Sequence, residues 1–233
     1  VFDATGEVSR ELTPRPPPWR VRVVDDSLFL LIGHPAQGGD LLRLVHPDGR
    51  LISSFFDAEA ALTEPLLRPH SVVFADARDG VVFAGLFGGD SVFAFDYRGQ
   101  RLARVPIDPV EPLASLSRLA ADQGGRLRRP DGRWVHDGAR CLINVVALPD
   151  SSVALQVAEY DATLGTDPLE GGLLLVYTMR VRRPRLVTRA AVSEGLIGRD
   201  RSGGLLLLGY SDTSRLGHRL QRVVSPSGSR REF

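Results

Sequence analysis

The residues best suited to chemistry are acids and histidines in or beside four loops, each of which follows an apolar run. These loops span residues 33–40, 88–90, 159–172 and 210–217. The candidate ligand-binding residues are His34, Asp40, Asp90, Glu159, Asp161, Asp212 and His218. Carboxylates in flexible loops suit Ca²⁺, which takes about 6–8 oxygen ligands. Because arginine is abundant and a full ligand set is not evident, we expect internal arginine pairing rather than a metal, and no required cofactor.

Motifs for nucleophilic catalysis are weak. The tetrapeptide at 89–92 (GDSV) is similar to the start of the GDSL hydrolase box, but it lies in a predicted β-hairpin and therefore predicts a turn. Ser211, Asp212 and His218 are close in sequence, but no G-x-S-x-G elbow accompanies them. The chain has no lysine, which excludes a Schiff-base or P-loop lysine within it. We predict no catalytic residue.

Arginine-rich stretches at 126–133 and 180–185 raise the question of nucleic acid. The net charge of +1 and the lack of an aromatic stacking motif argue against nucleic-acid binding. The first stretch lies in a long insertion, 107–140, with a helix-spaced segment at 113–121 and a predicted hairpin at 126–136. Loops of this length are usually functional or mobile. We expect its residues Arg126, Arg128, Arg133 and Trp134 to form a partner surface.

Composition is that of a globular chain. It has 233 residues, of which 43% are hydrophobic and 24% are charged, enough for one large β domain. No apolar run approaches the roughly 20 residues of a membrane helix. Cys141 is the sole cysteine, so no intramolecular disulfide can form. No signal segment is recognisable, and the start at Val1, with Met179 as the only methionine, leads us to expect a processed or truncated end.

The candidate ligand-binding residues are positioned by short predicted strands that occur in groups of four. The first group is 20–24, 28–32, 41–45 and 51–56; the second is 71–75, 81–87, 91–96 and 102–105. The third is 142–148, 153–158, 173–178 and 185–190; the fourth is 195–197, 205–210, 218–224 and 230–233. Turn signals rich in glycine and aspartate separate the strands, as in a meander of antiparallel hairpins.

The groups repeat in register. An aspartate precedes the second strand of each group, at positions 26, 79, 150 and 200, and a glycine ends the last hairpin at positions 6, 49, 99 and 228. A period of about 40–50 residues with four strands per unit predicts a β-propeller of four-stranded antiparallel blades. Second strands are unbroken apolar runs, which predicts burial on both faces. A β-sandwich is the rival fold, but it does not explain the four-strand repeat.

The predicted organisation is a single all-β propeller domain, or a portion of one, over 1–233. Its parts are an outer hairpin at 1–12, blades at 19–56, 70–106, 141–190 and 194–233, and the insertion at 107–140. About four complete blades plus a leading hairpin predict part of a larger ring. The alternative is a five-membered ring closed by pairing of 8–12 with the last unit.

The segments VFDATGEVSREL, LVHPDGRLISSF and FDYRGQRLARVP resemble the outer hairpins of NHL-like and TolB-like six-bladed bacterial β-propellers. The resemblance covers nearly the whole chain through short, degenerate motifs. It implies a six-bladed ring and a periplasmic or extracellular location. Propellers of this kind include sugar-lactonase-like enzymes, whose Glu/Asn/Asp metal set cannot be matched here residue by residue.

The function predicted from these observations is a non-enzymatic module that binds a protein or small ligand through one face of the ring. The alternative is a metal-assisted hydrolase or lyase, sugar-lactonase-like, acting at the mouth of the central channel. An enzyme requires acids or histidines that converge on one site, whereas a binding module does not.

Overall fold

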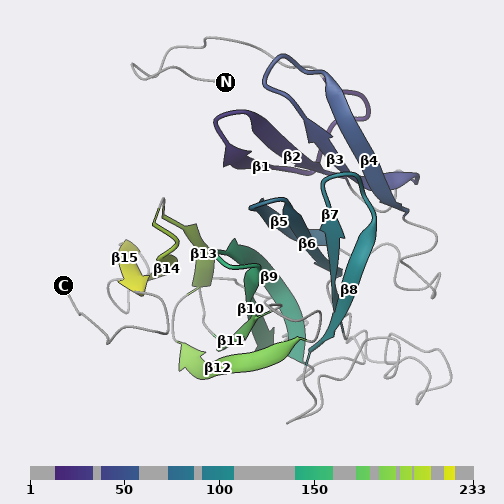
Figure 1. The fold of residues 1–233 in the computed structure, drawn as a ribbon. Coiled ribbons are helices and arrows are strands. Elements are labelled where there is room, and N and C mark those ends of the chain that lie inside the picture. Colours follow the sequence, from purple (N-terminus) through teal and green to yellow (C-terminus); the bar gives the residue numbers. More distant parts are fainter. Residues whose placement is uncertain are drawn as a thin grey trace, which may run out of the picture.

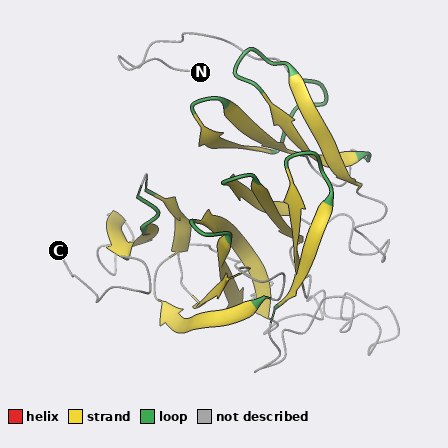
Figure 2. Ribbon diagram, viewed as in Figure 1, coloured by secondary structure: helices red, strands yellow, loops and turns green. Residues whose placement is uncertain are grey.

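Short apolar runs separated by turn residues form a chain of β-strands. The computed structural model describes residues 14–33, 38–57, 73–86, 91–107, 140–159, 172–178, 184–192, 195–200, 202–210 and 218–223. Within these ranges the chain is all-β, with fifteen strands and no helix (Figures 1 and 2). Predictions for 1–12, for 108–139 and for a last strand at 230–233 lie outside the described residues.

The strands form four antiparallel sheets, and in each sheet the strands are paired in sequence order. The first sheet contains β1 (Arg20–Asp25), β2 (Leu28–Ile32), β3 (Asp40–Val45) and β4 (Leu51–Asp57). The second contains β5 (Val73–Arg78), β6 (Val81–Leu86), β7 (Ser91–Asp96) and β8 (Arg101–Pro106). The third contains β9 (Arg140–Leu148), β10 (Ser152–Glu159), β11 (Gly172–Thr178) and β12 (Arg185–Val192). The fourth has three described strands, β13 (Gly195–Arg199), β14 (Leu205–Tyr210) and β15 (His218–Val223).

Those predicted turns that the structure describes occur where the sequence places them. Asp79 and Asp150 adopt positive φ angles of 50° and 58° in the turns between first and second strands. Gly49 and Gly99 adopt φ angles of 90° and 85° in the turns between third and fourth strands. Aspartate tolerates this left-handed region better than most residues, and glycine adopts it without steric cost. Local turn chemistry therefore sets the hairpin ends.

The core lies between successive sheets. One apolar cluster joins the first and second sheets, another joins the second and third, and a smaller one joins the third and fourth. As predicted, β2, β6 and β10 each have buried residues on both faces. The prediction is wrong for β14, where Leu205 and Leu207 are buried but Leu206 and Leu208 are only partly buried, because the structure describes no further sheet against that face. In Figure 1 the sheets follow one another around a curve, with β1, β5, β9 and β13 toward its inside and β4, β8 and β12 toward its outside. Neighbouring first strands are also in contact, β1 with β5, β5 with β9 and β9 with β13.

Two predicted strand ends are wrong in the same way. The strand expected to end at residue 75 continues as β5 to Arg78, and the strand expected to end at residue 197 continues as β13 to Arg199. Each extension includes a charged residue, Asp76 in β5 and Arg199 in β13. A charged residue is disfavoured in a buried strand unless it has a partner, and here the two residues are each other's partners.

Candidate functional site

The structure describes the backbone of three of the predicted ligand-binding residues. Asp40 is the exposed first residue of β3, Glu159 is the last residue of β10, and His218 is the first residue of β15. All three lie at the end of their sheet where the second strand stops or the third begins, as the sequence predicted. Outside the described residues lie His34, Asp90, Asp161, Asp212, Arg126, Arg128, Arg133 and Trp134.

Within the described ranges, no three His, Cys, Asp or Glu side chains gather closely enough to hold a metal ion. The described residues also include no helix long and apolar enough to span a membrane. Of the predicted ligand-binding residues, the structure thus gives the backbone positions of Asp40, Glu159 and His218, each at the same end of its own sheet.

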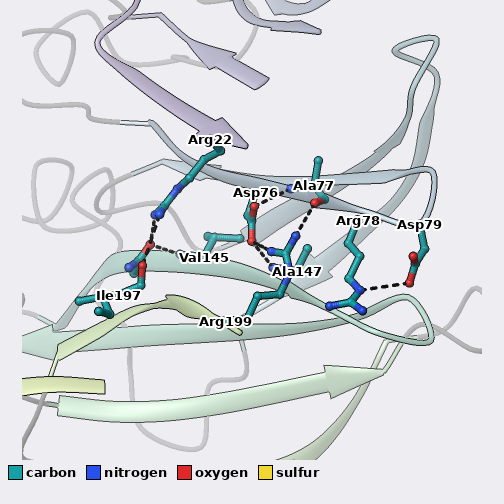
Figure 3. A network of polar contacts seen from close by, with 10 residues as sticks. Arg22, Asp76, Ala77, Arg78, Asp79, Val145, Ala147, Ile197 and Arg199 are labelled. Carbon is teal, nitrogen blue, oxygen red and sulfur yellow. Dashed lines mark hydrogen bonds and ion pairs between the residues drawn. The ribbon is translucent and has the colours of Figure 1, made fainter. Parts of the chain in front are cut away.

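What the structure does bring together is a set of polar side chains near the first strands, the inner polar network. Its members are Arg22 on β1, Asp76 on β5, Asn144 on β9, Gln156 on β10 and Arg199 on β13. Figure 3 shows Arg22 extending from β1 toward Ile197 and Arg199 lying against Asp76 and Ala77. Each of the four sheets contributes at least one side chain. The network therefore links segments that are far apart in the sequence.

Asp76 is the centre of the tightest part of this network. Its Oδ2 atom accepts hydrogen bonds from the Arg199 guanidinium and from the Ala147 amide, the latter at 3.0 Å. Its Oδ1 atom accepts from the Ala77 amide at 2.9 Å, and Arg199 also donates to the Ala77 carbonyl at 2.9 Å. The side chains of Asp76 and Arg199 are only 6% and 12% exposed. The carboxylate thus joins β5 to both β9 and β13.

The electrostatics of Asp76 follow from its burial. Removal from water raises the pKa of this carboxyl, because the charged form loses hydration. The Arg199 charge and the amides of Ala147 and Ala77 act in the opposite direction. This is a carboxylate held among donors in the interior, and it is the only buried acid in the described part of the chain.

The two buried amides hold the β13 backbone. The Asn144 side chain donates to the Leu196 carbonyl, and the Leu196 amide donates to Gln156 Oε1 at 2.7 Å. Asn144 Oδ1 also accepts from the Val145 amide at 2.9 Å. Gln156 is fully buried and Asn144 is 7% exposed, so these bonds satisfy groups that would otherwise be costly to bury. Together they fasten the fourth sheet to the third.

Arg20 and Arg22 extend from the same side of β1, since residues two apart on a strand share a face. Arg22 donates to the Ile197 carbonyl and to Asn144 Oδ1, both at 3.3 Å. The Arg20 guanidinium carbon lies 4.8 Å from the centre of the Phe74 ring, a cation–π contact. Burial, followed by the nearby charge of Arg22, lowers the pKa of Arg20. None of the ion pairs found among the described residues involves either arginine.

Sequence reasoning did not find the inner polar network. Two signals were available, since Asn144 is the only asparagine in the chain and Gln156 interrupts an otherwise apolar strand. A polar residue in a doubly buried strand requires a hydrogen-bond partner, so both positions indicate a buried contact. The partner itself could not be identified, because it lies on another sheet.

No protein-family model matches the chain, and no curated protein matches it. Among solved structures, the chain is similar to a protein of unknown function from Bacteroides caccae, with 11% sequence identity and a TM-score of 0.41. The alignment covers 88% of this chain and 60% of that protein. At this level the similarity assigns neither a family nor a function.

Proposed function

We propose that the chain forms a β-propeller, or a portion of a six-bladed NHL-like ring, and works as a non-enzymatic module that binds a protein or small ligand. Four successive antiparallel sheets, stacked face to face in sequence order, support the propeller. The contacts between consecutive first strands support a common axis near β1, β5, β9 and β13. Six blades require sheets beyond the four described here.

The observation that carries the non-enzymatic assignment is the engagement of Asp76. A general base needs a lone pair within reach of the substrate proton. The Asp76 carboxylate instead accepts from two backbone amides and a guanidinium, and it holds three sheets together. A group committed in this way supports a structural role, and it leaves ligand binding to the ends and faces of the sheets.

The proposed binding function is tested by screening for ligands and then determining whether each ligand is chemically changed by the protein. Thermal unfolding of the whole chain is measured against a panel of small metabolites, and each stabilising compound is incubated with the protein and recovered for mass spectrometry. Binding raises the melting temperature by mass action. We expect stabilising compounds to be recovered unchanged. Catalytic conversion of a stabilising compound would overturn the proposal and favour the hydrolase or lyase alternative.

A further inference from the structure

The arginines of β1 differ from the arginine of β13 in their partners. Arg199 is neutralised by a direct ion pair with Asp76. Arg22 donates only to two neutral oxygens in the described part of the chain, and both bonds, at 3.3 Å, are longer than the usual range for N–H···O bonds. A guanidinium has five N–H donors, so these contacts use two of them.

Arg20 adds a second charge beside Arg22. It is half-buried, and the contact found for it in the described part of the chain is with the Phe74 ring. Like charges repel more strongly where water is partly excluded, and this repulsion contributes to the lowered pKa of Arg20. Arg20, Arg22, Arg199 and Asp76 together carry three positive charges and one negative charge. The net charge of these four side chains is +2 even though Asp76 attracts Arg22 as well as Arg199. A bound dianion would offset this charge, and a single carboxylate would halve it.

We infer that Arg20 and Arg22 bind an oxyanion, a carboxylate or phosphate group, at the inner edge of the first sheet. The inference rests on the proposed binding function and names its ligand class. Planar guanidiniums match both oxyanions through pairs of parallel N–H···O bonds, whereas they have no such fit to chloride. The Phe74 ring holds the Arg20 fork in place, which reduces the entropy lost when an anion binds.

The position of the site agrees with this role. Arg20 opens β1 and pairs in register with Ile32, the last residue of β2. It therefore lies at the same end of the first sheet as Asp40, the loop residue that begins β3. The proposed oxyanion site therefore lies at the end of the first sheet where the sequence predicts ligand-binding residues.

The test measures thermal unfolding of the whole chain in sodium phosphate, sodium succinate and sodium chloride at equal ionic strength and neutral pH. Phosphate or succinate at ten times its dissociation constant should raise the melting temperature by about 3–6 °C relative to chloride. The two oxyanions distinguish a phosphate site from a carboxylate site. The rise should be lost in Arg20→Gln and Arg22→Gln and kept in Arg98→Gln, an exposed arginine in the β7–β8 turn.

Arg22→Gln removes two hydrogen bonds and could fail to fold. Among the described residues, the Arg20 side chain forms no hydrogen bond and contacts the Phe74 ring. Arg20→Gln is therefore sufficient to test the inference. The inference is overturned if neither oxyanion exceeds chloride, or if Arg20→Gln responds as Arg98→Gln does. Chemical conversion of the added anion would instead contradict the proposed non-enzymatic function, so the two failures are distinguishable.

Discussion

Separating Asp76 from Arg199 tests whether this pair holds the sheets together. The two single variants are Asp76→Asn and Arg199→Met. Asparagine replaces one carboxylate oxygen with an NH₂ group, so at least one of the three donors around Asp76 loses its acceptor. Methionine leaves the carboxylate buried with backbone amides alone. Removing one partner of a buried ion pair costs about 3–5 kcal/mol, and each variant should lose about that much of the free energy of unfolding.

The double variant removes both charges and should be less destabilised than the sum of the single effects, by about 1–3 kcal/mol. Urea unfolding followed by circular dichroism measures each free energy, provided that the slope with urea is unchanged. Arg78→Met is the matched control, because Arg78 pairs with the exposed Asp79 at 3.4 Å and should contribute less than about 1 kcal/mol. Additive effects of Asp76→Asn and Arg199→Met would refute a direct coupling.

The same variants have a pH dependence whose sign follows from the raised pKa of Asp76. The folded state holds the proton of this carboxyl more tightly than the unfolded chain, so its contribution to stability falls as pH rises through the raised pKa. Arg199→Met removes the charge that most opposes this rise. The cost of Arg199→Met should therefore be greater at about pH 8 than at about pH 5. An equal cost at both pH values would contradict the reasoning.

Three further predictions concern the joints between sheets and the predicted mouth. Gly99→Ala should lower the free energy of unfolding in urea by about 1–3 kcal/mol more than Gly80→Ala does. Both glycines have positive φ, but only at position 99 does the added carbon meet a side chain, that of Phe55 at 2.7 Å. Equal costs would exclude a packing effect. Gln156→Leu should cost about 1–3 kcal/mol in the same assay, because it leaves a buried β13 amide without its acceptor; an unchanged stability would show that this bond is unimportant. Calorimetric titration with Ca²⁺ should give no stoichiometric heat; a heat abolished by Glu159→Ala would overturn this expectation and favour the enzyme alternative.

The sequence by itself determined the local architecture. Apolar runs and turn residues predicted the existence of all the described strands, and three of them, β2, β7 and β14, begin and end at the predicted residues. Hairpin pairing is a short-range property, because the turn type and the alternation of side chains set the register between adjacent strands. The same local information predicted burial on both faces for β2, β6 and β10, but it was wrong for β14, where Leu206 and Leu208 are only partly buried.

Only the tertiary structure decided where the polar groups of the inner strands find their partners. Two of the misplaced strand ends, those of β5 and β13, involve the pair of Asp76 and Arg199, which are 123 positions apart in the sequence. The Ala147 amide that also binds Asp76 is 71 positions away. From the local sequence alone, a buried strand is expected to end before a charged residue, because burying an unpaired charge costs roughly several kcal/mol. Its partner compensates for that cost only after the sheets have stacked, so no local pattern of residues contains the information.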